Sequence, residues 1–147
     1  MNEAGPALEV LSVRRRFSRA LSGRIAYPPP HEERGPLLET LLFNEIRSFL
    51  SYPNRPYPMH FWRNYDGVEV DFLCETTEGF IAADFKASTR WDKRSSRGLH
   101  RMQSEMGTRL HRCYGVYLGD RSAHWDNLHV LPVEGFLHRL WDGEILR

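Results

Sequence analysis

The stretch VEVDFLCETTEGFIAADFKAS, residues 68–88, decides the fold. It holds two largely apolar segments, residues 68–75 and 80–86, separated by a short polar turn that contains a glycine. Segments of this length and composition predict two antiparallel strands joined by a tight connection. A third segment, residues 59–64, precedes them and leads into an Asp-Gly turn, which is a strong hairpin signal. The sequence therefore predicts a three-stranded antiparallel meander.

The charged residues within these strands are the first candidates for function. Because side chains alternate along a strand, Val70 and Phe72 should share one face and Asp71 should point to the other. Asp84 and Lys86 should share a face at the end of a strand that is otherwise apolar. Burying charged groups is costly unless they are paired. The plain interpretation is an Asp–Lys ion pair at a strand end, and the alternative is a functional site.

Further helices and strands are expected around the meander. Apolar residues at helical spacing and apolar runs of strand length predict helices at 36–50, 95–111 and 133–141 and strands at 113–118 and 127–131. Pro36 suits the first turn of its helix. This order of elements predicts an α/β protein with a mixed sheet flanked by helices.

The beginning of the chain is expected to stand apart from this core. Residues 7–22 read as a helix rich in arginine, and residues 25–35 contain three consecutive prolines that should break any helix. We therefore divide the chain into a helix with a proline-rich strap, residues 1–30, and a main domain, residues 31–147.

Composition excludes several classes of protein. The chain has 147 residues, of which 41% are hydrophobic and 27% charged, with a formal net charge of +1. No apolar run approaches the roughly 20 residues of a membrane span, and no secretory leader is evident. The two cysteines lie far apart in the sequence and lack metal-ligand spacing, which argues against both a disulfide scaffold and a cysteine zinc site. A cytoplasmic protein with no membrane contact is expected.

The spacing of the acidic residues resembles that of PD-(D/E)XK nucleases, which have a restriction-endonuclease-like fold. Asp71 on one strand is followed 13 residues later by Asp84-Phe-Lys86 on the next, with Glu39 on a preceding helix. The resemblance implies that Glu39, Asp71 and Asp84 bind Mg²⁺ or Mn²⁺, because such cations prefer oxygen ligands. Lys86 would then orient the attacking water and stabilise charge on the phosphate.

A second carboxylate competes for the place on the helix. Glu45 falls within the apolar stripe of residues 36–50, whereas Glu39 lies at its edge. We favour Glu39 as the metal ligand and expect Glu45, Arg63 and Glu69 to lie just outside the ligand set. Arg63 is expected to pair with either Glu45 or Glu69.

A closer resemblance covers about residues 23–147. The segments GPLLETLLFNEI, FWRNYDGVEVDFL, IAADFKAS and VLPVEGFLHRLWDGEIL are similar to the C-terminal domain of a family of prokaryotic AAA+ ATPases, a domain without assigned function. In that family the acid before the lysine is usually Glu, whereas here it is Asp84. The chain contains no phosphate-binding loop of the GxxxxGK[ST] type. The resemblance thus implies a fragment of such an ATPase, a split gene product whose AAA+ ATPase partner is encoded separately, or a freestanding relic of the ATPase tail.

Basic residues follow the Asp-Phe-Lys strand. Residues 88–112 hold seven Lys or Arg against two acids, and Lys93, Arg94, Arg97 and Arg101 are the candidates for contacting the backbone of DNA. Trp91 is a candidate for stacking on a base. The plain alternative is a solvated helix face.

Two functional hypotheses follow from these residues. In the first the domain is a Mg²⁺-dependent DNA endonuclease. In the second it is a catalytically inactive nuclease fold that binds nucleic acid or a protein. The sequence does not decide whether the domain is an enzyme.

Overall fold

The computed structural model of the chain describes residues 29–52 and 57–146. In chain order its elements are α2 (His31–Ser51), β1 (Met59–Arg63), β2 (Glu69–Thr76), β3 (Gly79–Lys86), α3 (Arg97–Met106), the 3-10 turn η1 (Gly107–Arg109), β4 (Leu110–Tyr117), β5 (Ala123–Trp125), β6 (Leu128–Pro132) and α4 (Val133–Trp141). The helix predicted at 7–22 and nearly all of the proposed N-terminal unit, residues 1–30, lie outside the described residues.

A single mixed sheet organises the described residues. Its strand order is β1-β2-β3-β4-β6-β5, with β1, β2 and β3 antiparallel, and with β4 parallel to both β3 and β6. The predicted meander is confirmed, and so is the mixed α/β sheet. The chain crosses from β3 to the parallel strand β4 through α3. No helix in the described part of the chain is long and apolar enough to cross a bilayer.

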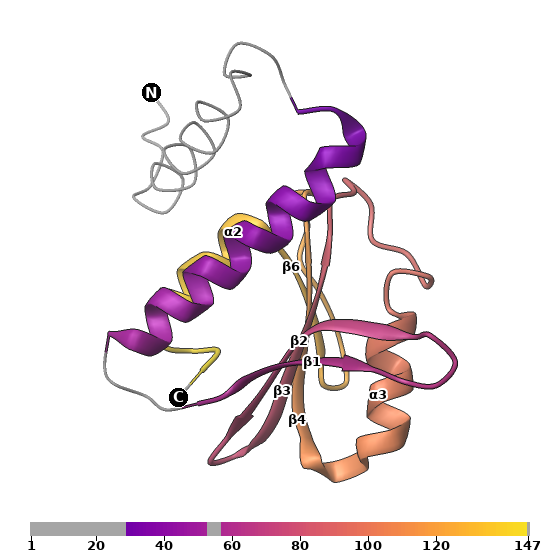
Figure 1. Cartoon of the computed structure of the whole chain (residues 1–147), viewed down its shortest axis with the longest axis vertical. Coiled ribbons are helices and arrows are strands. Elements are labelled where there is room, and N and C mark those ends of the chain that lie inside the picture. Colours follow the sequence, from indigo (N-terminus) through magenta and orange to yellow (C-terminus); the bar gives the residue numbers. More distant parts are fainter. Residues whose placement is uncertain (1–28, 53–56, 147) are drawn as a thin grey trace.

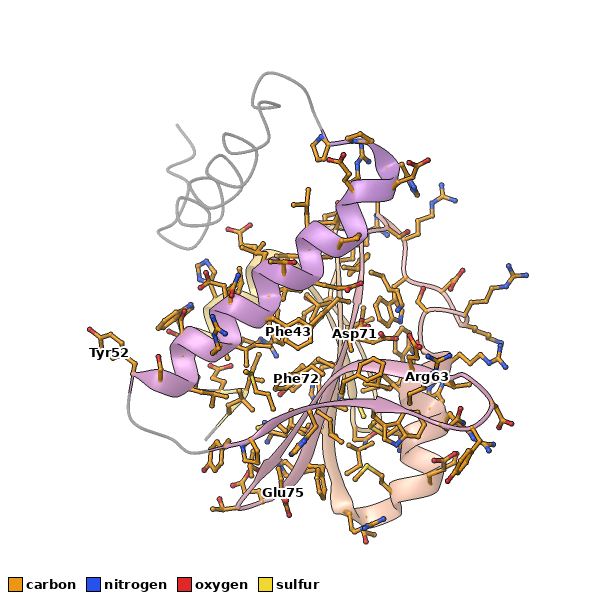
Figure 2. The ribbon with its side chains drawn as sticks, in the orientation of Figure 1. Phe43, Tyr52, Arg63, Asp71, Phe72 and Glu75 are labelled. Atoms are coloured by element: carbon orange, nitrogen blue, oxygen red, sulfur yellow. The ribbon has the colours of Figure 1, made fainter. Side chains whose placement is uncertain are left out.

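Helices cover both faces of the sheet (Figure 1). On one face α2 and α4 bury an apolar cluster that includes Leu42, Phe72 and Phe136, and on the other α3 packs through Leu99 and Met102. Figure 2 shows Phe43 of α2 directed at Phe72, and the two rings meet edge to face with centroids 6.4 Å apart. The predicted apolar stripe of the first main helix is therefore its buried face.

The first main helix begins earlier than expected. Residues 31–35 are helical, although the proline-rich composition predicted a break through Gly35. Pro30 is the residue before the helix, where a missing N–H costs nothing, and Glu32 and Glu33 favour the positive end of the helix dipole. Pro36 consequently lies inside α2 rather than in its first turn.

The second main helix is shorter than expected, and its predicted stripe was partly wrong. The prediction of 95–111 placed Leu110 on a helical stripe with Leu99. The helix instead ends before Gly107, which adopts a positive φ of 56° that suits glycine. Leu110 opens β4 and pairs with Phe80 of β3.

The expected alternation along β2 was also wrong. Val70 packs on the α3 face whereas Phe72 packs on the α2 face. The register explains the difference, because Trp62 pairs with Val70 but His60 pairs with Leu73. The extra residue forms a β-bulge in β2 between Val70 and Leu73. The bulge changes the direction of the side chains close to Asp71, beside the end of the β2–β3 ladder.

A short edge strand was not anticipated. β5 pairs with β6 through a two-residue turn at 126–127, in which Asp126 has a φ of 49°. With only three residues, β5 shows too little alternation to be recognised, although an Asp-Asn pair is a known turn signal.

Candidate functional site

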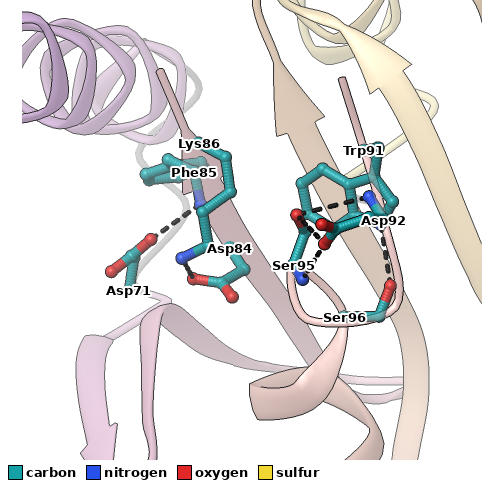
Figure 3. Close-up of polar contacts among 8 residues, drawn as sticks. All are labelled: Asp71, Asp84, Phe85, Lys86, Trp91, Asp92, Ser95 and Ser96. Carbon is teal, nitrogen blue, oxygen red and sulfur yellow. Dashed lines mark hydrogen bonds and ion pairs between the residues drawn. The ribbon is translucent and has the colours of Figure 1, made fainter. Parts of the chain in front are cut away.

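The site forms where β2 and β3 separate. Their last paired residues are Phe72 and Ala83, and the next residue on each strand is an aspartate, Asp71 and Asp84. Oδ2 of Asp71 accepts a hydrogen bond of 2.7 Å from the backbone N–H of Phe85 (Figure 3). The Asp71 carboxylate therefore takes the place of the backbone carbonyl that would accept this hydrogen bond in a continued strand pair.

Asp84 and Lys86 form an ion pair at this point. Lys86 Nζ donates to Oδ1 of Asp84 over 2.9 Å, and Figure 3 shows this contact beside Asp71. The Asp84 side chain is only 4% exposed and that of Lys86 is 38% exposed. The carboxyl group of Asp71 lies near enough to that of Asp84 to raise its pKa. The predicted convergence of Asp71, Asp84 and Lys86 is confirmed.

Burial and like charge change the protonation of this cluster. Burial, together with the hydrogen bond and charge of Asp71, raises the pKa of Asp84 to about 8, against the opposing effect of Lys86. Burial disfavours the charged form of Lys86, but neighbouring carboxylates, Asp84 foremost, raise its pKa. Burial and the neighbouring Asp71 therefore favour the protonated form of Asp84, while the ion pair with Lys86 opposes it.

Glu39 approaches the same cluster from α2. Partial burial and then the charge of Asp71 raise the pKa of Glu39, while Lys86 lowers it and Glu69 raises it slightly. Glu39 is thus close enough to feel the charges of Asp71 and Lys86. Glu39 therefore lies on the side of α2 that is near Asp71 and Lys86.

Glu45 lies elsewhere, contrary to the expectation that it would support the ligand set. It is buried at the contact between α2 and α4, where Oε2 accepts a hydrogen bond of 3.1 Å from the indole N–H of Trp141. Six residues of helix separate it from Glu39, which amounts to about 9 Å along the axis and a different face. Its contact with Trp141 assigns Glu45 to helix packing.

Arg63 and Glu69 flank the site from the β1–β2 hairpin. Arg63 Nε lies 3.2 Å from Oε1 of Glu69, and both side chains are largely exposed. Of the two partners expected for Arg63, the structure shows Glu69 and not Glu45. Glu69 also contributes to the raised pKa of Glu39, which places this ion pair beside the acidic cluster.

The donor chemistry of the cluster suits a hard divalent cation. Asp71, Asp84 and Glu39 would supply carboxylate oxygens, the ligands that Mg²⁺ and Mn²⁺ prefer. Burial favours the protonated form of Asp84, and a cation bound there would displace that proton. Within residues 29–52 and 57–146, however, no three His, Cys, Asp or Glu side chains are gathered closely enough to hold a metal as they stand. Binding would require Glu39 to move inward or water to complete the ligand set.

Comparison with known proteins gives a family but no activity. A family model described as a domain of unknown function, DUF4143, matches residues 34–136. The chain belongs to the DUF4143 family. No curated protein and no solved structure matches the chain. The DUF4143 match contains Glu39, Asp71, Asp84 and Lys86, so the whole acidic cluster lies in the family region.

The predicted basic residues of this DUF4143 domain fall into two groups. Lys93 and Arg94 are exposed in the loop between β3 and α3, and Arg97 is exposed in the first turn of α3. Arg101 instead pairs with Glu105 at 2.8 Å and with Asp66 at 3.4 Å. The charge of Arg101 is therefore largely committed within the protein.

Trp91 does not have the exposure that stacking on a base would require. Its indole N–H donates to Ser96 Oγ over 2.7 Å, and its ring packs edge to face on Tyr117. A methyl group at Gly115 would overlap the Trp91 ring, so the glycine makes room for it. Trp91 anchors the loop after Lys86, and its ring is partly buried, which leaves less of it available to stack on a base.

One exposed aromatic residue was overlooked in the sequence. Tyr65 occupies the β1–β2 turn, and its side chain is fully exposed. The available signal was its position directly before the Asp-Gly pair, because a residue at a hairpin tip seldom contributes to a core.

Proposed function

We propose that this domain is a Mg²⁺- or Mn²⁺-dependent phosphodiesterase that cuts DNA, with a PD-(D/E)XK active site. The observation that carries the proposal is the meeting of Asp71 and Asp84 beside Lys86 at the ends of neighbouring strands. Structural ion pairs are common at strand ends, but two adjacent carboxyl groups in one buried site destabilise the folded protein. Such an arrangement is typical of functional sites.

The arrangement of elements supports the same proposal. A helix carrying Glu39 precedes three antiparallel strands, and these are followed by α3 and the parallel strand β4. Asp71 stands on the second strand of the meander, and the Asp84-Phe-Lys86 motif stands on the third. Each candidate therefore lies on the element that the resemblance to PD-(D/E)XK nucleases implies.

The residues of the chain divide the chemistry among them. Glu39, Asp71 and Asp84 would hold the cation, which when bound polarises the phosphate and acidifies a water molecule. Lys86 stays protonated because neighbouring carboxylates raise its pKa. Its ammonium group can therefore donate a hydrogen bond to the attacking water or to a phosphate oxygen as negative charge develops.

Cleavage of plasmid, duplex, flap and junction DNA in Mg²⁺, Mn²⁺ or EDTA tests this proposal. Wild type should cut at least one substrate in metal and none in EDTA, and Asp84→Asn should cut none. Glu75→Gln is the matched control, because Glu75 is exposed at the opposite end of β2 from Asp71 (Figure 2). Equal cleavage by wild type and Asp84→Asn would reject the proposed active site.

A second candidate function is a binding or regulatory module that has lost catalysis. The observation that favours it is that Lys86 already satisfies Asp84, while the described residues hold no ready group of three metal-binding side chains. The resemblance to the C-terminal domain of AAA+ ATPases makes such an ATPase the protein partner to test. DNA or ATPase binding by a wild-type domain that never cuts would favour this second function.

A further inference from the structure

A groove lies between the β1–β2 turn and α3. It consists of two adjoining hollows of about 330 and 400 Å³ that share Asp66 and Arg101 in their walls. Trp62 and Val68 supply apolar surface to its lining. Arg97 and His100 on α3 and Tyr65 on the turn also line it.

The turn that carries Tyr65 is well defined. The backbone N–H of Asn64 donates to the carbonyl oxygen of Val68 over 2.9 Å, and the Asn64 side-chain oxygen accepts a hydrogen bond of 2.9 Å from the Val68 N–H. Gly67 has a φ of 75°, which closes the turn. The ion pair between Asp66 and Arg101 also holds the turn against α3. Tyr65 is therefore an exposed ring on a well-defined turn, so little backbone entropy is lost when a ligand packs against it.

The charges in the groove single out one arginine. Arg101 is engaged by Glu105 and Asp66. Arg97, one turn earlier on α3, forms no ion pair with any described residue and is exposed. Its guanidinium group can therefore bind an anion without first giving up an acidic partner. His100 stands beside it in the lining and adds a second hydrogen-bonding side chain.

The wall of the groove formed by α3 packs on β2 two residues from Asp71. Gly98 packs so closely on β2 that a methyl group there would overlap the backbone oxygen of Glu69. Glu69 precedes Asp71 by two residues, and its charge reaches Glu39. A chain of anionic groups bound along α3 would thus lead from Arg97 toward the Asp71–Asp84 pair.

We propose that this groove binds single-stranded nucleic acid, with a base stacked on Tyr65 and a phosphate on Arg97. The proposal rests on the nuclease function above and names its substrate as an unpaired strand. Hollows of this volume match a few nucleotides rather than the width of a duplex. An exposed aromatic ring combined with a nearby cation is the usual device for holding single strands without reading their sequence.

Fluorescence anisotropy in EDTA measures binding without cleavage. The probes are labelled dT and rU oligomers of about 12 nucleotides, within the usual range of strand-binding sites, and a blunt duplex of matched length. Tyr65→Ala should weaken binding of a single strand about tenfold or more, while Tyr65→Phe should retain most of it. Arg97→Ala should weaken binding and reduce its salt dependence by about 0.7 log units per lost phosphate contact. Trp125→Ala is the control, since Trp125 is an exposed aromatic on the edge strand β5.

The outcomes separate this groove from the active site. Unchanged dT and rU affinity in Tyr65→Ala would overturn the proposal, as would equal losses in Tyr65→Ala and Trp125→Ala. Equal loss of duplex affinity would also overturn it. If wild type cuts DNA and Tyr65→Ala binds single strands normally, the groove is rejected and the nuclease proposal stands. Tyr65-dependent binding by a domain that never cuts would uphold the groove and reject the nuclease.

Discussion

Lys86 Nζ donates a hydrogen bond of 2.9 Å to Oδ1 of the buried Asp84, two residues earlier on the same strand. One ammonium group faces two carboxyls, because Asp71 lies beside Asp84. Burial of Asp84 first, and then the hydrogen bond and negative charge of Asp71, raise the pKa of Asp84 to about 8 despite the ion pair. This imbalance is the basis of the first two predictions.

Stability should fall as the pH rises toward 8. The folded protein binds a proton at Asp84 that the unfolded chain releases near pH 3.8, and stability declines wherever the folded state holds more protons. Between about pH 5 and 8, wild type should therefore lose free energy of unfolding relative to Asp84→Asn, by at most about 1.4 kcal/mol per pH unit. Lys86 does not contribute in this window, because its pKa is raised from 10.5. Urea midpoints of both proteins across the range measure the effect, and a constant difference would contradict it.

Divalent metal should stabilise the wild type. A cation that binds only the folded state adds about 2.7 kcal/mol at one hundred times its dissociation constant. The gain in melting temperature from Mn²⁺ should be larger at pH 8 than at pH 6, because metal and proton compete for the Asp71–Asp84 pair. Glu75→Gln should respond as wild type does, and Asp84→Asn should not respond. Melting curves of wild type that coincide in EDTA and Mn²⁺ would count against a metal site.

Lys86 should matter for cleavage more than for binding. Lys86→Ala should reduce the cleavage rate by about 10²-fold or more, because its interaction with the phosphate or the water strengthens only in the transition state. Affinity for DNA should change little, since Arg94 and Arg97 remain. Single-turnover rates and anisotropy on the same DNA separate the two quantities. Parallel losses of rate and affinity would show that Lys86 acts in binding.

Gly115→Ala should destabilise the domain through Trp91. The added methyl group would overlap the indole ring, and overpacking of this kind costs about 1–3 kcal/mol. Gly135→Ala is the matched control, because it adds the same methyl group to α4 with only Pro132 nearby. Chemical denaturation should show a lower midpoint for Gly115→Ala alone. Equal midpoints for the two variants would reject the packing role of Trp91.

The sequence allowed the meander and the meeting of the charged residues to be predicted for local reasons. The Asp-Gly turn sets the hairpin register, and two-residue spacing places Asp84 and Lys86 on one face. The bulge in β2 could not be predicted in this way, because one extra residue moves Val70 to the face opposite Phe72 without changing composition.

The packing contacts of Glu45 and Trp91 could not be predicted, for a common reason. The partner of Glu45 is Trp141, which lies 96 residues away in the chain, and the space for Trp91 is provided by Gly115. Contacts between distant segments decide whether such side chains are buried or available. Periodicity within a single segment carries no information about them.

The most direct test of the proposed metal site is anomalous diffraction from crystals soaked in Mn²⁺. The central claim is that Asp71 and Asp84 together bind a divalent cation as the first requirement for cleavage. We predict an anomalous peak between the two carboxylates, with Lys86 turned away from Oδ1 of Asp84. Well-ordered carboxylates with no peak between them, and with Lys86 still bound to Asp84 as it is here, would contradict the claim.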